Sequence, residues 1–125
     1  MLTNAPVSSV LPASDLARAK EFYQKKLGLK LLSDSMPGTV LFEAGHGTRM
    51  EIYEHGVPKA ENTAASFAVE DIAAAVRELK GNGIIFEEYD FPDFKTVESI
   101  ATMGTMKAAW FKDTEGNILC LHEGG

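Results

Sequence analysis

The sequence lacks several features that would mark a specialised class of protein. Cys120 is its only cysteine, so no disulfide can form within the chain, and no charged-then-apolar leader is visible. No apolar run approaches the roughly 20 residues of a membrane span. Positive charge is scarce too, because 12 Lys and Arg stand against 18 Asp and Glu, for a net charge of −6. These absences predict a cytoplasmic protein with neither a membrane nor a nucleic-acid partner.

What the chain does contain is an internal repeat. Residues 13–19 resemble residues 69–75, with Asp15 matched to Asp71 at an offset of 56 residues. Residues 42–54 resemble residues 111–123, with Phe42 matched to Phe111 at an offset of 69. The second copy therefore holds 13 additional residues. A repeat of about half the chain indicates one supersecondary unit used twice, with a shared site between the copies.

Each copy predicts the order β-α-β-β-β within a single domain of residues 1–125. In the first copy, Ser14-Asp15 cap a helix that ends at Gly28, and in the second Glu70-Asp71 open a helix that ends near residue 80. The strands are predicted at residues 7–13, 29–34, 39–44 and 48–54, then 64–69, 84–89, 106–112 and 117–122. Module 1 is about 5–55, module 2 about 62–123, and residues 56–61 link them.

The 13 additional residues fall within residues 90–105, which contain Phe91 and Phe94. A long connection of this kind is either a lid or a surface loop that packs its aromatic side chains onto the core. The nearby acidic cluster has no regular ligand spacing and predicts a solvated edge; it comprises Glu87, Glu88, Asp90 and Asp93.

Residues two apart on a strand share a face, and this parity selects the candidate site. In the last strand of module 1, Met50 and Ile52 should pack on the helix, which leaves Glu51 and Tyr53 on the other face. In module 2, Leu119 and Leu121 take the packing role. The predicted ligand-binding residues on the other face are Ser8, Glu51, Tyr53, Ser66, Cys120 and His122.

Three motifs carry a resemblance to a known family. These are Asp15–Tyr23 (DLARAKEFY), Leu27-Gly28-Leu29 and Trp110–Asn117 (WFKDTEGN). Together with the paired modules they resemble the vicinal oxygen chelate superfamily, which includes glyoxalase I, the bleomycin-resistance proteins and the extradiol dioxygenases. The resemblance spans residues 7–123. It implies an α+β fold whose two modules form a cupped, mixed eight-stranded sheet with the helices outside, and it implies a homodimer.

The resemblance also places a metal site, which this chain does not match. Metal-dependent members use four inward positions, typically His or Gln on the first strand and Glu on the last strand of each module. These positions fall on Ser8, Ala64, Glu51 and Cys120. Only Glu51 fits the pattern, and one carboxylate with one thiol falls short of the three or four donors that such ions need. We therefore expect no metal ligands and no cofactor.

Three functions stay open at this stage. The first is a metal-free module that binds a small, partly aromatic ligand, as bleomycin-resistance relatives do. The second is a metal-dependent lyase, isomerase or dioxygenase, against which Ser8 and Ala64 argue. The third is a metal-independent enzyme with Glu51 as catalytic base and Tyr53 or Cys120 assisting.

Each candidate side chain also has a simpler interpretation. Glu51 can be satisfied by Arg49 or Tyr53 without any ligand. Cys120 can be a small core residue rather than a nucleophile, because a thiolate needs a nearby base or positive charge. His122 is either the partner of Cys120 or an exposed histidine at the rim.

Overall fold

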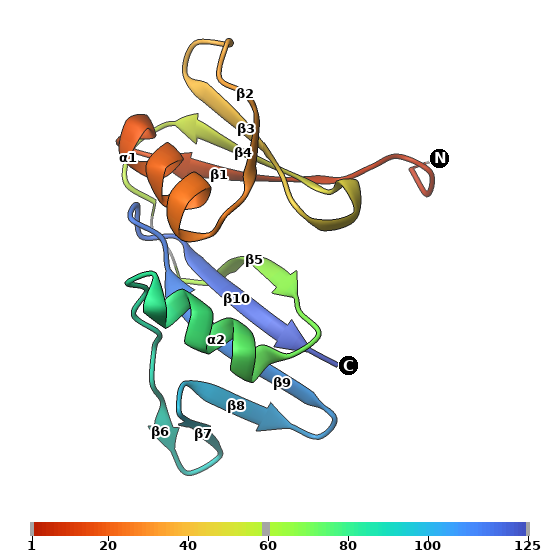
Figure 1. Cartoon of the computed structure of the whole chain (residues 1–125), viewed down its shortest axis with the longest axis vertical. Helices are drawn as coiled ribbons and strands as arrows, with labels where there is room; N and C mark the ends of the chain where they lie inside the picture. The colour runs from red at the N-terminus through yellow and green to blue at the C-terminus, as the bar shows by residue number, and fades with distance from the viewer. Residues whose placement is uncertain (1, 59–60, 125) are drawn as a thin grey trace. The chain divides into compact units, whose positions relative to one another are not determined.

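The computed structural model describes residues 2–58 and 61–124, so the predicted linker residues 59 and 60 lie outside the described part. The chain forms two compact units. The first comprises the described residues up to 58 together with Thr114–Asn117, and the second comprises residues 61–113 and 118–124. Figure 1 shows that each unit has its own sheet and its own principal helix. None of the described helices is long and apolar enough to cross a membrane.

The first unit is a four-stranded mixed sheet with strand order β1-β4-β3-β2. β1 pairs in parallel with β4, and the other pairs are antiparallel. The strands are β1 (Ser8–Ala13), β2 (Lys30–Ser33), β3 (Thr39–Glu43) and β4 (Arg49–Glu54). Every strand lies within a residue or two of its predicted range, because alternating apolar residues and short turns define each one locally.

The helix of the first unit begins where the sequence predicts. α1 (Leu16–Glu21) follows Asp15, whose side chain accepts a hydrogen bond from the Arg18 amide at 3.0 Å. The helix continues as a π-helical turn over Phe22–Lys26. Gly28 then ends it with a φ of +72°, a left-handed conformation that favours glycine. Ala19, Phe22 and Tyr23 are buried and form the core with one face of the sheet.

The second unit is a six-stranded sheet with order β5-β10-β9-β8-β7-β6. β5 pairs in parallel with β10, as β1 does with β4, so the repeat predicted from sequence is present. α2 (Ile72–Gly81) packs against this sheet, and the Asp71 side chain caps it by accepting from the Ala74 amide. The strands are β5 (Thr63–Ala68), β6 (Asp90–Phe91), β7 (Phe94–Val97), β8 (Ile100–Met103), β9 (Met106–Lys112) and β10 (Ile118–Glu123).

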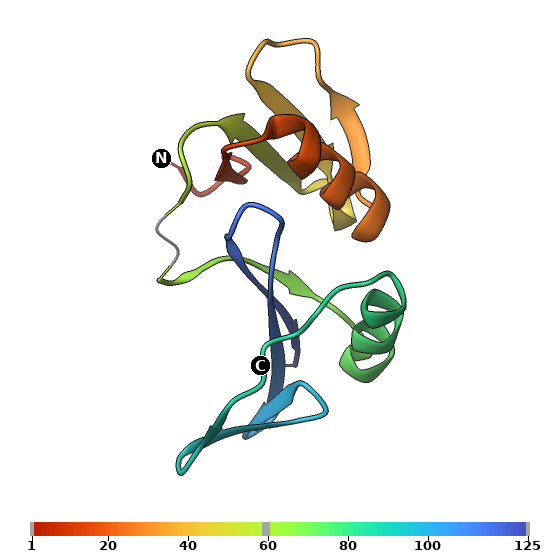
Figure 2. The same cartoon turned by 90° about the vertical axis from the view of Figure 1, so that its left-hand side faces the viewer.

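The predicted strand at residues 84–89 is wrong. This segment forms only an isolated bridge, between Phe86 and Phe111, and one further hydrogen bond from the Glu87 amide to the Trp110 carbonyl. Phe86 nevertheless bridges Phe111 as Leu31 pairs with the equivalent Phe42, so residues 84–89 keep the place of β2, whereas β8 pairs with the first half of β9. The additional residues form antiparallel strands that extend the sheet beyond β9, as Figure 2 shows.

These strands are tied to residues 84–89 by polar contacts. Glu88 is exposed, as expected of a solvated edge, and it accepts hydrogen bonds from the Ser99 amide and hydroxyl and from the Thr96 hydroxyl. The hydrogen bonds from Ser99 and Thr96 lower the pKa of Glu88 below its ordinary value. Phe94 packs on Trp110 with ring centroids 5.5 Å apart.

The fold class is thus confirmed as α+β with two modules and mixed sheets. The strands differ in number from the prediction, because the described residues form one four-stranded and one six-stranded sheet in place of a single eight-stranded one. β6, β7 and β8 were not predicted and residues 84–89 form no regular strand, which together account for the difference.

Candidate functional site

Strand parity in the first unit is as predicted. On β4, Met50 is 3% exposed and Ile52 is fully buried, whereas Glu51 and Tyr53 are half-buried on the opposite face. On β1, Leu11 and Ala13 are buried and belong to the core. The sheet therefore has a face packed against the helix and a second face, here called the helix-free face, that carries Glu51 and Tyr53.

Glu51 lies between apolar neighbours on this face. Its register partners are Val10 on β1 and Leu41 on β3. Among the described residues the Glu51 carboxylate forms no hydrogen bond or ion pair, and Arg49 does not reach it. A half-buried charge flanked by aliphatic side chains loses part of its hydration without a compensating partner. The structure thus gives no support to the simpler interpretation, in which a neighbouring side chain satisfies Glu51.

Tyr53 lies two residues further along the same face. Its register partners are Pro12 and Thr39, and its ring is 5.5 Å from the ring of His55. Ser8 is exposed and pairs with Arg49 in the register, so it lies two pairs away from Glu51. The first unit therefore brings Glu51 and Tyr53 together, with an aromatic side chain beside them.

The second unit brings the other three predicted residues together. Ser66 on β5 is the register partner of Cys120 on β10, and its hydroxyl is hydrogen-bonded to His122 Nδ1 at 2.5 Å. Leu119 and Leu121 are buried on the helix-packed face, as predicted. The sequence identified Ser66 and His122 separately but not as a bonded pair, because the contact depends on the parallel register of two strands far apart in the chain.

Cys120 is buried at 6% exposure, and its thiol donates to the Leu121 carbonyl at 3.2 Å. Burial raises the pKa of the thiol above its ordinary value, although hydrogen bonds with Ser66 and the Ala109 backbone oppose part of this shift. A thiol in these surroundings is seldom ionised near neutral pH, so Cys120 is better suited to packing than to nucleophilic attack.

This environment predicts slow alkylation of Cys120. The thiol is buried and little of it is ionised at pH 7. Iodoacetamide should therefore modify the native protein at least about tenfold more slowly than protein unfolded in guanidinium. Mass spectrometry of quenched time points measures both rates, and the unfolded sample is the control. Equal rates in the two samples would show that Cys120 is an accessible, reactive thiol.

The four positions of the family's metal site do not supply a metal centre in this chain. Ala64 has no donor atom, and Ser8 offers only a neutral hydroxyl, which is a weak metal ligand. Cys120 and Glu51 remain, and two donors fall short of the three or four that such ions need. Within either unit, the described residues form no group of three or more His, Cys, Asp or Glu side chains placed to hold a metal. The residues present do not fit the four-ligand site.

Solved structures share this fold at low sequence identity. A glyoxalase family protein from Bacillus anthracis matches with a TM-score of 0.73 and 16% identity over 100% of both chains. One from Enterococcus faecalis matches with a TM-score of 0.72 and 23% identity, over 98% of this chain and 100% of that one. The third is a variant of the fosfomycin resistance protein FosX from Listeria monocytogenes, in complex with manganese(II) and dihydroxypropylphosphonic acid. It has a TM-score of 0.70 and 17% identity, over 97% and 91% of the two chains.

A comparison with curated proteins finds no match. The family assignment comes from the sequence itself. Residues 6–121 match the family model described as the Glyoxalase/Bleomycin resistance protein/Dioxygenase superfamily. This match covers nearly the whole chain and agrees with the β-α-β-β-β repeat and the fold of each unit. The chain belongs to the glyoxalase/bleomycin resistance protein/dioxygenase superfamily.

Proposed function

We propose that this protein binds a small organic ligand on the helix-free face of its sheet, with Glu51 as the polar anchor and without a four-ligand metal centre. The observation that carries the proposal is the half-buried Glu51 carboxylate, which has no partner among the described residues. Keeping a charge in such a place costs stability unless something else binds it. A ligand that donates hydrogen bonds to this carboxylate would satisfy the charge.

The neighbours of Glu51 indicate the kind of ligand. Val10 and Leu41 flank the carboxylate, and Tyr53 with His55 adds aromatic surface on one side. A cationic or amide-bearing head group would bind Glu51 while an apolar or aromatic body covers the aliphatic and aromatic side chains. The net charge of −6 agrees with a cationic ligand. In the second unit taken by itself, Ser66 and His122 form a hydrogen-bonded polar pair on the corresponding face.

The test is a thermal-shift screen of small amines, amidines and aromatic amides, followed by calorimetry of the compounds that bind. We expect Glu51→Gln to fold normally and to bind such a compound about 5- to 150-fold more weakly, which corresponds to about 1–3 kcal/mol for one charged hydrogen bond. The glutamine keeps the size of the side chain but removes its charge.

Glu54→Gln is the matched control, because Glu54 lies on the same strand, is exposed and carries the same charge. It should leave binding unchanged. If Glu51→Gln binds as well as the unsubstituted protein but unfolds more easily, then Glu51 is structural and the proposal is wrong. Elemental analysis of the purified protein addresses the metal separately, since one equivalent per chain that is lost in Glu51→Ala would contradict a metal-free site.

The alternative is a metal-independent lyase, isomerase or dioxygenase that uses Glu51 as a general base. The observation in its favour is the phenol of Tyr53 on the same face as an unpaired carboxylate, which is a pair suited to moving a proton. Incubating each binding compound with the protein and analysing it by mass spectrometry distinguishes the two. Turnover that is absent in Glu51→Gln supports the enzyme, whereas unchanged compound supports a binding protein. The homodimer implied by the family stays a prediction.

A further inference from the structure

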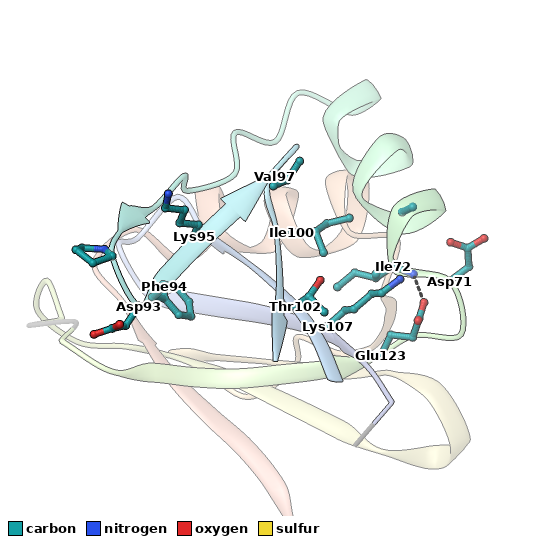
Figure 3. A pocket seen from close by; sticks show the side chains of 12 residues that line it. Asp71, Ile72, Asp93, Phe94, Lys95, Val97, Ile100, Thr102, Lys107 and Glu123 are labelled. Carbon is teal, nitrogen blue, oxygen red and sulfur yellow. Dashed lines mark hydrogen bonds between the residues drawn. The ribbon is translucent and has the colours of Figure 1, made fainter. Parts of the chain in front are cut away.

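A cavity lies in the second unit, away from the face that carries Ser66 and His122. Its volume is about 500 Å³, which is in the range of pockets that hold small molecules. It lies between the start of α2 and strands β7 to β10, on the side of the sheet that packs against the helix. Part of its lining comes from residues 92–102, so the additional residues of the second repeat build it. Figure 3 shows the cavity from close by.

One end of the cavity is polar. Thr102, Lys107 and Glu123 are register partners in a row across β8, β9 and β10. Glu123 Oε1 accepts a hydrogen bond from the Ile72 amide at 2.9 Å, at the beginning of α2. This bond holds the carboxylate toward the helix, and Lys107 forms no ion pair with it or with any other described residue. Lys107 and Glu123 are thus neighbours in this row, and their side chains form no ion pair with each other (Figure 3).

The cavity also has an apolar part. Phe94, Val97 and Ile100 come from β7 and β8, and Ile72 contributes from α2. Val97 is 75% exposed, which is unusual for a large aliphatic side chain that lines a cavity. A ligand with an aliphatic group would remove this surface from water, and each buried methylene contributes favourably to binding.

From this arrangement we propose that the cavity binds a free α-amino acid with an apolar side chain. The ligand's carboxylate would bind Lys107 and Thr102, its ammonium would bind Glu123, and its side chain would cover Ile100 and Val97. Glu123 can accept this second bond because a carboxylate has acceptor capacity beyond the one used by Ile72. The charges of the lining also have both signs, since Asp71, Asp93 and Glu123 stand with Lys95 and Lys107, which favours a zwitterion over a single ion.

The test uses L-leucine, L-methionine and L-phenylalanine as probes, with binding followed by calorimetry and by two-dimensional NMR of the full chain. We expect saturable binding of at least one of them, with shifts at Ile72 and Ile100. Isocaproate, which lacks the ammonium of leucine, and isoamylamine, which lacks its carboxylate, should each bind at least about tenfold more weakly, because each loses one charged hydrogen-bonding group.

Variants separate this site from the surface around it. Lys107→Gln should weaken amino-acid binding at least about tenfold. Glu123→Gln should do the same while keeping an acceptor for the Ile72 amide, so the helix cap is retained. Lys112→Gln, on the same strand but outside the cavity lining, is the matched control and should bind normally.

Three results would overturn the proposal: no saturable binding of any of the three amino acids, unchanged binding by Lys107→Gln, or isocaproate binding as tightly as leucine. Glu51→Gln should leave amino-acid binding unchanged, because Glu51 belongs to the other unit. The two proposals therefore fail or succeed independently.

Discussion

Replacing Glu115 with alanine is expected to lower the free energy of unfolding by about 2–3 kcal/mol, because it removes a buried carboxylate that accepts several hydrogen bonds. The Glu115 side chain is fully buried and belongs to the first unit. It accepts hydrogen bonds from the Asp15 amide at 3.0 Å, from Arg18 Nε at 2.7 Å and from the hydroxyls of Ser14 and Thr114 at 3.1 and 3.0 Å. Removal leaves the Asp15 amide without its acceptor at the point where α1 begins.

The same network makes stability depend on pH. Hydrogen bonds from Arg18, Asp15, Thr114 and Ser14 outweigh the effect of burial and lower the pKa of Glu115 to about 2, from an ordinary value of 4.5. A carboxyl whose pKa is lower in the folded state stabilises the fold above its unfolded pKa. Its contribution is therefore complete above about pH 5 and is lost progressively as the pH falls through 4.5 toward 2.

Urea denaturation at about pH 7 and pH 3 measures both effects. Glu115→Gln keeps the volume of the side chain but cannot ionise, so its stability should change less between the two pH values than that of the unsubstituted protein. Glu54→Gln, an exposed control in the same unit, should match the unsubstituted protein at both. If Glu115→Ala costs less than about 1 kcal/mol, or Glu115→Gln keeps the full pH dependence, the network is not a main source of stability.

Much of the fold could be predicted because its signals are local. Asp15 and Asp71 cap helices within three residues of themselves, and Gly28 ends a helix through its own backbone conformation. Alternation along β4 likewise predicted that Met50 and Ile52 would be buried. Each of these features depends on residues that are neighbours in sequence, where periodicity and capping preferences apply directly.

The features that could not be predicted depend on distant partners. Glu115 lies about 100 residues from Ser14, Asp15 and Arg18, so nothing near it in the sequence indicates a bond. Two segments share the edge of β9, since Phe86 bridges Phe111 and β8 pairs with the other half, and the apolar pattern alone does not predict this division. β8 pairs with the first half of β9, and the Glu88 contacts to Ser99 and Thr96 tie residues 84–89 to β7 and the turn that follows it.

The candidate site divides in the same way. Parity placed Glu51, Tyr53, Cys120 and His122 on their strand faces, because side-chain direction alternates along any strand. Parity did not show that Glu51 would lack a partner, because that depends on which residues of the neighbouring strands lie beside it. In the structure these are the apolar Val10 and Leu41. The cavity around Lys107 was not predicted either. It depends on the strand register that places Thr102, Lys107 and Glu123 side by side on three strands.

The repeat leads to a second large effect, at a pair of equivalent phenylalanines. Phe42 on β3 and Phe111 on β9 are both fully buried, one in each unit. The ring of Phe42 packs 5.9 Å from that of Tyr23, and the ring of Phe111 packs 5.2 Å from that of Phe86. Phe42→Ala and Phe111→Ala should each lower the free energy of unfolding by about 3–5 kcal/mol, because each removes a buried ring and leaves a cavity.

Chemical denaturation followed by circular dichroism and by fluorescence of Trp110, the single tryptophan, measures both variants. Phe91→Ala is the matched control, since Phe91 is 57% exposed and its loss should change stability by no more than about 0.5 kcal/mol. Phe42→Leu and Phe111→Leu refill most of the cavity and should recover more than half of the loss. The two rings hold the same place in the two repeats. If either alanine variant loses less than about 1 kcal/mol of unfolding free energy, that unit does not depend on its buried ring, and the two modules share a backbone fold but not their core packing.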